Sequence, residues 1–213
     1  MTAPELLFLL QGFRWTIALA AIAFACGIPS GLAIALARTS ENPLLQRPAS
    51  AYIALFQGTP LLMQLFVAYY GLALAGIRLE AWAAVAIGFM LHASAYLGEI
   101  WRGSIAAIPR GQTEAANALG LHYWARMQKV ILPQAIRISL PATIGFLVQL
   151  IKGTSLAALV GFIELTQSGK IIANQIFKPL LVFAIVGALY FVLCWPLSVV
   201  GTHLERRLAT ASR

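Results

Sequence analysis

The chain contains no aspartate, and seven glutamates supply all of its side-chain carboxylates. Charged residues of both signs make up only 10% of its 213 residues, whereas a typical soluble domain carries about 25%. Its two cysteines, Cys26 and Cys194, both lie in apolar runs, where a thiol behaves as a small hydrophobic side chain. The cysteines therefore predict neither a disulfide nor a metal site.

Signatures of nucleotide binding and of covalent catalysis are also missing. The Gly169-Lys170 pair is followed by Ile171 and lacks the upstream glycine of a phosphate-cradling loop. The sequence has no Cys/His spacing suited to a metal and no arrangement typical of a nucleophilic triad. We therefore expect no catalytic residue and no cofactor in this chain, so that any ATP hydrolysis must take place on another chain.

Long apolar runs are what the sequence has instead. Apolar residues make up 60% of the chain, and its mean hydropathy is +0.82. A helix needs about 20 mostly apolar residues to cross a bilayer. The sequence predicts an all-α membrane protein in which residues 1–213 form a single transmembrane domain. The five candidate spans are roughly 13–37, 51–75, 81–101, 139–163 and 180–203.

Positive charge is distributed unevenly between the loops that join these spans. Cytoplasmic loops are enriched in Lys and Arg, so the charge pattern predicts the topology. We expect the N-terminus outside, the C-terminus inside and the third loop in the cytoplasm. The first and third loops and the C-terminal tail hold Arg38, Arg47, Arg102, Arg110, Arg126, Lys129, Arg137, Arg206, Arg207 and Arg213. The second and fourth loops hold Arg78, Lys170 and Lys178.

The third loop is a polar, helix-forming insert between apolar segments. Pro109 can begin a helix, the alanine-rich stretch 112–119 favours one, and Gly120 permits a sharp stop. A second amphipathic run follows, and we expect Pro133 to end it. Two short helices that meet at a glycine form a rigid knob, which can dock in a groove of a partner. The alternative is a helix pair that lies on lipid headgroups.

The spacing within this loop resembles that of a known motif. Glu114-Ala115-Ala116 is followed after three residues by Gly120 and, after nine intervening residues, by the run 130–133. This pattern resembles the EAA loop of bacterial ABC importer permeases, with valine in place of isoleucine at the first position of the run. The resemblance implies that the loop contacts a cytoplasmic ATPase. The residues that match the motif are Glu114, Ala115, Ala116, Gly120, Leu132 and Pro133.

Further blocks resemble the polar amino-acid uptake subfamily, which includes histidine, glutamine and arginine permeases. They are Gly-Thr-Pro at 58–60, Ala-Tyr-Leu-Gly-Glu-Ile at 95–100, Ile-Pro-Arg-Gly-Gln-Thr-Glu-Ala-Ala at 108–116 and Lys-Gly-Thr-Ser-Leu at 152–156. The resemblance implies a permease in the bacterial inner membrane that moves a polar amino acid into the cytoplasm. It also implies three partners: a cytoplasmic ATPase dimer that binds ATP and Mg, a second permease subunit that is identical or paralogous, and an extracytoplasmic solute-binding protein.

Several polar residues lie at membrane depth and are candidates for solute contact. A charged side chain there costs about 2.5–3.5 kcal/mol, so Lys152 should face protein, water or an anionic partner. Backbone freed by local unwinding at Gly153 could join it in receiving a carboxylate. An ammonium or a polar side chain of the solute would need acceptors from the second span and the outer mouth. The predicted solute-binding residues are Gln57, Thr59, Gln64, Lys152, Thr154, Ser155 and Glu164.

Other roles for these residues stay open. Lys152 could pair with a glutamate of its own or a neighbouring subunit, Glu164 could be solvated, and Thr59 and Gln64 could bond between helices. Glu99 and Arg102, three residues apart, are explained by an interfacial ion pair. For the whole chain, a secondary transporter or a pore subunit independent of an ATPase is the alternative function. A pore subunit assigns no role to the knob, and the inverted repeat and intramembrane carboxylate cluster expected of a secondary transporter are not visible in the sequence.

Overall fold

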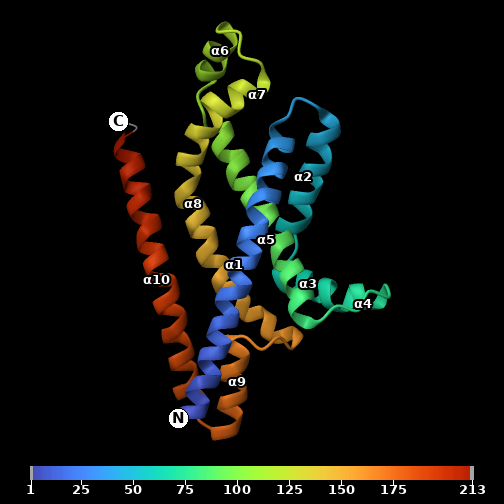
Figure 1. The fold of residues 1–213 in the computed structure, drawn as a ribbon, viewed down its shortest axis with the longest axis vertical. Helices are drawn as coiled ribbons and strands as arrows, with labels where there is room; N and C mark the ends of the chain where they lie inside the picture. Colours follow the sequence, from blue (N-terminus) through green and yellow to red (C-terminus); the bar gives the residue numbers. More distant parts are fainter. Residues whose placement is uncertain (1, 212–213) are drawn as a thin grey trace.

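The computed structural model describes residues 2–211 as a bundle of long helices (Figure 1). Four helical segments are long and apolar enough to cross a membrane: Ala3–Thr39, Ala81–Ala106, Tyr123–Val160 and Pro179–Leu208. A fifth candidate is a pair of helices, Pro43–Gln57 and Leu61–Leu74, bent by 104° at a short break. The predicted all-α membrane fold is confirmed.

The helical elements follow one another with few loops. The long helices are α1 (Ala3–Thr39), α2 (Pro43–Gln57), α5 (Ala81–Ala106), α8 (Leu132–Gly153) and α10 (Pro179–Ala211). The shorter α-helices are α3 (Leu61–Phe66), α4 (Leu72–Leu74), α6 (Arg110–Ala118), α7 (Tyr123–Arg126) and α9 (Leu165–Ile176). Two π-helical turns, η1 (Val67–Gly71) and η2 (Met127–Ile131), and one 3₁₀ segment, η3 (Thr154–Val160), complete the order.

Helices α1 and α5 form the most extensive contact in the bundle, and glycines make it possible. A Cβ added at Gly27 would lie 2.8 Å from Cβ of Ala93, and one added at Gly31 would lie 2.9 Å from Cβ of Leu97. Helix α1 continues through Pro29, which lies between these two glycines. Small residues at a membrane-helix interface allow backbones to approach closely, so this stripe sets the separation of α1 and α5.

The second span differs from the continuous helix that the sequence predicted over 51–75. The chain leaves the helix at residues 58–60, Gly-Thr-Pro, and α3 continues in a new direction. Pro60 lacks the N–H that a continuing helix would need, which accounts for the position of the break. Figure 1 shows α3 and α4 extending to one side of the bundle.

The expectation that Pro133 ends the second helix of the knob is wrong. Helical structure runs without interruption from Tyr123 through Pro133 to Val160. The π-helical turn η2 just before the proline shifts the hydrogen bonding, so that Leu132 N–H donates to the carbonyl of Met127. A π-turn of this kind accommodates the proline, because the hydrogen-bond register changes where its missing N–H would otherwise be needed.

The segment that follows the fourth span was expected to be an external loop, but residues 165–176 form helix α9. This helix packs between α1 and α10. Two small residues permit the contact: a Cβ at Gly12 of α1 would lie 2.9 Å from the carbonyl oxygen of Glu164, and one at Gly169 would lie 2.6 Å from Val186 of α10. A search for long apolar runs does not detect α9, because this helix is short and amphipathic.

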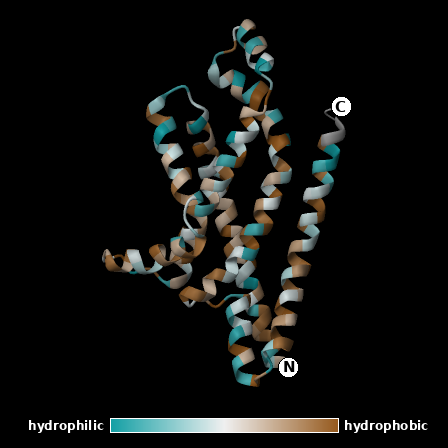
Figure 2. Cartoon of the chain, turned by 180° about the vertical axis from the view of Figure 1, so that it is seen from behind, coloured by the Kyte–Doolittle hydropathy of each residue, from teal (hydrophilic) through white to brown (hydrophobic). Residues whose placement is uncertain are grey.

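The two ends of the bundle carry different elements. The α6–α7 pair and the end of α10 lie at one end, whereas the start of α1 and helix α9 lie at the other (Figure 1). Figure 2 shows hydrophobic residues along much of the long helices and hydrophilic residues on the α6–α7 pair. Arg213, one of the residues in the predicted charge pattern, lies outside the described residues.

Replacement of Gly31 by alanine should destabilise the protein, because its new Cβ would also lie 3.2 Å from the backbone N of Gly98. Overpacking of this kind costs about 1–3 kcal/mol. We expect a lower midpoint in thermal unfolding of the purified protein in detergent. Gly103→Ala on α5 is the matched control, since a Cβ there has nothing within 4 Å. Equal midpoints for the two variants would contradict the role of the stripe.

Candidate functional site

The α6–α7 knob is held in shape by the turn at Gly120. This glycine has a φ of +72°, a left-handed conformation that an L side chain rarely adopts. Its N–H donates to the carbonyl of Asn117 at 2.9 Å, and the N–H of Leu121 donates to the carbonyl of Ala116 at 3.1 Å. These two bonds form a Schellman motif, which ends α6 and turns the chain towards α7. The sharp stop predicted at Gly120 is confirmed.

The knob is anchored on one side and exposed on the other. Ile108, Met127 and Ile131 are buried together at its base. Arg126 donates to the side-chain oxygen of Asn117 and so ties the second helix to the first. On the outer side Leu119 is 80% exposed. Trp124 on α7 is also exposed, so the knob offers a partner two large apolar side chains on a mostly polar element.

The predicted motif residues are divided between these two sides. Ala116 is buried, whereas Glu114 and Ala115 are exposed on α6. Leu132 and Pro133 lie at the start of α8, within the helix that leads from the knob into the bundle. The loop therefore combines an exposed contact surface with a direct helical connection to membrane depth.

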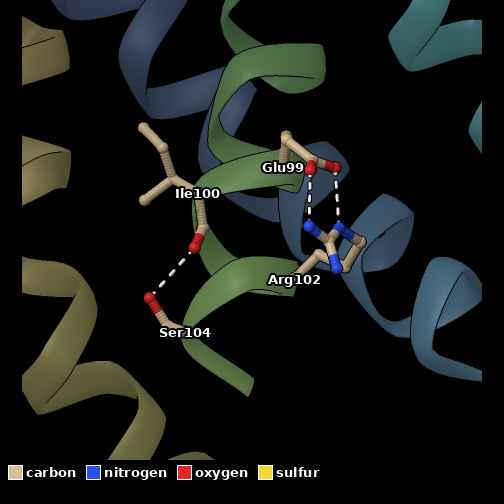
Figure 3. Close-up of polar contacts among 4 residues, drawn as sticks. All are labelled: Glu99, Ile100, Arg102 and Ser104. Carbon is tan, nitrogen blue, oxygen red and sulfur yellow. Dashed lines mark hydrogen bonds and ion pairs between the residues drawn. The ribbon is translucent and has the colours of Figure 1, made fainter. Parts of the chain in front are cut away.

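The ion pair expected between Glu99 and Arg102 is confirmed. Arg102 Nη2 lies 2.6 Å from Glu99 Oε1, and Arg102 Nε lies 2.8 Å from Oε2 (Figure 3). One turn further along α5, the hydroxyl of Ser104 donates to the carbonyl of Ile100 at 2.9 Å. The charge of Glu99 is thus neutralised by Arg102 of the same helix.

Lys152 lies in a groove between α8 and α10 that both apolar and polar residues line. The groove has a volume of about 810 Å³ and adjoins a second hollow of about 390 Å³, which shares Lys152 and Ser198 with it. Small-molecule sites typically have volumes of about 300–1,000 Å³. Within residues 2–208 no carboxylate forms an ion pair with Lys152. The polar residues that line the larger groove are Gln149, Lys152, Ser198, Thr202 and Glu205.

The local unwinding expected at Gly153 takes a different form. Gly153 keeps helical dihedral angles, and the chain tightens into the 3₁₀ segment η3. The hydroxyl of Thr154 donates to the carbonyl of Ile151, and the hydroxyl of Ser155 donates to that of Lys152, both at 2.7 Å. The Thr154 side chain is fully buried. Either hydroxyl would have to give up this bond before it could donate to a solute carboxylate, although its oxygen can still accept.

The structure brings the break in the second span close to this polar patch. A Cβ at Gly153 would lie 3.2 Å from the side chain of Leu61, the first residue of α3. Gln57, at the end of α2, is exposed. Thr59 and Gln64 line an apolar cavity of about 350 Å³ between the bent pair and α5. Lys152 and Gln64 therefore line different hollows, one between α8 and α10 and the other between the bent pair and α5.

Glu164 is fully buried and is not solvated, so that alternative is wrong. Its carboxylate accepts hydrogen bonds from the N–H of Gln167 and the hydroxyl of Tyr190, each at 2.9 Å, and from the hydroxyl of Thr16 at 3.3 Å. Burial raises the pKa of Glu164, and these donors oppose the rise. The carboxylate caps the N-terminus of α9 and joins that helix to α1 and α10.

Sequence reasoning missed most of the groove that surrounds Lys152. Gln149 lies one helical turn before Lys152 and was not among the predicted solute-binding residues, while Ser198, Thr202 and Glu205 lie in the last span and its tail. These last three residues fall at intervals of three or four along α10, so they share one face of the helix. That spacing is the signal that could have identified them.

Comparisons with known proteins agree with this geometry. The family model described as "Binding-protein-dependent transport system inner membrane component" matches residues 27–210. The probable amino-acid ABC transporter permease YckA of Bacillus subtilis is 39% identical over 202 residues, which cover 95% of this chain and 89% of that protein. The glutamine transport system permease GlnP of Escherichia coli K12 is 32% identical over 96% of this chain and 94% of its own length.

Solved structures show the same fold. A chain from the crystal structure of an amino acid ABC transporter with histidines superposes with a TM-score of 0.88 at 33% identity, covering 97% of this chain and 100% of that chain. A chain of the inward-facing MetNI methionine ABC transporter, at 21% identity and a TM-score of 0.76, shares the fold. This chain belongs to the binding-protein-dependent transport system inner membrane components, the permease subunits of ABC importers.

Proposed function

We propose that this chain is the transmembrane subunit of an ATP-driven importer that moves a polar amino acid across the bacterial inner membrane. The observation that carries the proposal is the rigid knob, whose second helix continues without interruption into the membrane-depth polar patch. The relatives that name an amino acid as their solute, and cover almost all of this chain, support the solute class. A secondary transporter or a pore would have no use for such a knob.

The proposed partners have distinct places on the molecule. A cytoplasmic ATPase dimer, which binds ATP and Mg, contacts the exposed side of the knob. A second permease subunit, identical or paralogous, covers the open side of the α8–α10 groove. A solute-binding protein delivers the amino acid at the opposite end, near α9. On this assignment the chain is a single membrane domain that carries no cofactor of its own.

The knob transmits the motion of the ATPase to the solute. Residues 123–152 form one helical rod, which at 1.5 Å per residue is about 44 Å long. Displacement of the knob therefore moves the Lys152 segment directly. Because the direction of α6 depends on the left-handed turn at Gly120, the same turn sets the orientation of the docking surface.

The solute passage follows the α8–α10 groove. A free amino acid carries a carboxylate and an ammonium, and both have to find partners where water is excluded. Lys152 offers a cation for the carboxylate, and Gln149 and Glu205 offer acceptors for the ammonium along the same groove. Thr154 and Ser155 adjoin Lys152 in the chain. For Gln57, Thr59, Gln64 and Glu164, solute contact stays a prediction.

The experiment that tests the function is uptake of radiolabelled amino acids into proteoliposomes that contain the purified permease, with and without its ATPase and solute-binding protein. ATP-dependent uptake that requires all the partners supports the proposal. Uptake by the permease alone would contradict it in favour of a secondary transporter or pore.

Substitution at Gly120 should uncouple ATP hydrolysis from uptake. Valine is strongly disfavoured at a φ of +72°, so Gly120→Val should redirect α6 and lower uptake at least ten-fold while the protein still inserts. Gly120→Asn is the matched control, because asparagine tolerates this conformation. Uptake and ATPase activity are measured on the same complexes. Normal coupling in the valine variant would refute the docking assignment.

Topology can be checked with single cysteines at positions 178, 119 and 206 in a background that lacks Cys26 and Cys194. We expect a membrane-impermeant thiol reagent added to intact cells to label position 178 only, because the other two lie at the end proposed to be cytoplasmic. Permeabilised cells should label all three. Labelling of position 119 from outside would reverse the orientation.

Replacement of Lys152 by methionine should weaken solute binding within the assembled importer. Loss of a hydrogen bond to a charged ligand costs about 1.5–3 kcal/mol, or roughly ten-fold or more in affinity. We expect KM for uptake to rise by that factor while ATP hydrolysis without solute persists. Lys170→Met, at an exposed lysine on α9, is the matched control. An unchanged KM in the Lys152 variant would place the passage elsewhere.

A further inference from the structure

The break between α2 and α3 removes backbone hydrogen bonds within the bent helix pair that is the fifth candidate membrane segment. In a continuous helix the carbonyl of Phe56 would accept from the N–H of residue 60, but Pro60 has none. With little water in the bilayer core, a freed carbonyl needs a donor from within the protein. The donors that replace the helical ones at this break come largely from side chains.

Two residues within the break, Gly58 and Thr59, donate to the carbonyls of the last turn of α2. The N–H of Gly58 donates to the carbonyl of Ala54 at 2.8 Å, as in a regular helix. The hydroxyl of Thr59 donates to the carbonyl of Leu55 at 2.7 Å, in the place of its own backbone N–H. The carbonyl of Phe56, next in order, is the one that Pro60 leaves without its helical donor.

The side-chain amide of Gln64 supplies that donor. Its Nε2 lies 2.7 Å from the carbonyl oxygen of Phe56 and 3.0 Å from that of Thr59. It also lies 3.0 Å from the hydroxyl oxygen of Thr59. One carboxamide therefore joins the last turn of α2 to the first turns of α3, across the whole break.

His92 on α5 determines which way the Gln64 amide points. Its Nδ1–H donates to Gln64 Oε1 at 3.0 Å, so the amide nitrogen is directed at the two carbonyls. The His92 ring is itself held by Tyr96, at a centroid distance of 4.4 Å, and by Phe146 of α8, at 6.2 Å. His92 is 9% exposed. The bend thus depends on α5 and α8 as well as on its own sequence.

We propose that Gln64 and His92 form a latch that fixes the angle between α2 and α3, and that both are positioning residues of the importer. The amide nitrogen of Gln64 faces three acceptors and its oxygen accepts from His92, so it has no free donor for a solute. The latch holds Leu61 against Gly153, next to Lys152. The role of the latch as a support for the solute passage rests on the proposed function.

The test measures the bend directly. Spin labels are attached at Leu44→Cys in α2 and Leu74→Cys in α4, which are 80% and 90% exposed, in a background that lacks Cys26 and Cys194. Pulsed dipolar spectroscopy on the assembled importer then gives the distance distribution between the labels. We expect one narrow distribution with the latch intact, and a shifted or broadened one in Gln64→Leu, which keeps the size of the side chain but has no hydrogen-bonding group.

His92→Phe is the second variant, because it keeps an aromatic ring for stacking and removes both ring nitrogens, including the Nδ1 that bonds to Gln64. It should change the distribution in the same direction, and the double variant should change it no further than Gln64→Leu alone, since the two residues act as a unit. Met63→Leu, beside Gln64 in the same cavity, is the control and should leave the distribution unaltered. If Gln64→Leu does not assemble, His92→Phe decides the question alone.

Uptake kinetics separate the latch from solute contact. Latch variants should lower kcat several-fold with little change in KM, whereas loss of a solute ligand would raise KM and leave the distance distribution as it was. An unaltered distribution in either assembled variant overturns the latch. Because the distance is measured without solute, failure of the amino-acid assignment would leave the shifted distribution in place and is therefore distinguishable.

Discussion

The structure depends on one constraint: every backbone N–H and C=O at membrane depth has to be bonded within the protein. Prolines make this difficult, and the chain accommodates Pro29, Pro60 and Pro133 in three different local ways. Helix α1 passes through Pro29 beside glycines that pack on α5. A π-turn precedes Pro133, and side chains take over the bonds lost at Pro60. The shape of the bundle therefore follows from how these missing donors are replaced.

The π-turn and the glycine contacts also determine which helices are joined to one another. Because the π-turn lets the helix continue through Pro133, the knob and the Lys152 segment belong to one rod. Close packing at Gly31 joins α1 to α5, and close packing at Gly169 joins α9 to α10; α5 and α10 in turn pack against α8. Under the function proposed above, a push on the knob would reach membrane depth as a displacement of these packed helices.

Polar residues of the bundle fall into two groups. Glu164, Thr154 and Gln64 form hydrogen bonds with neighbouring helices or with their own, and these bonds stabilise the fold. Lys152 and Glu205 are exposed and line a groove instead, without an ion pair between them. A lysine at membrane depth is costly unless it faces protein, water or a partner, which is why we propose this groove as the path of a polar solute.

Sequence alone determined the class of fold, the approximate spans and the knob with its turn at Gly120, because these features rest on local properties: apolar length, helix propensity and the freedom of one glycine. It also located the ion pair of Glu99 with Arg102, which requires only helical spacing. Local properties did not predict whether the helix would break or continue at Pro60 and at Pro133. One breaks a helix and the other does not, because the outcome depends on donors and turns supplied around each.

Tertiary structure decided which polar side chains are hydrogen-bonded within the bundle and which line a groove. Gln64 and Lys152 look alike in sequence as polar groups within apolar spans, yet His92, twenty-eight positions from Gln64, engages the first, and α10 forms a groove beside the second. Glu164 meets Thr16 and Tyr190 only after three helices have packed together. Contacts between residues far apart in the chain depend on how helices pack, and single-sequence periodicity carries no information about that packing.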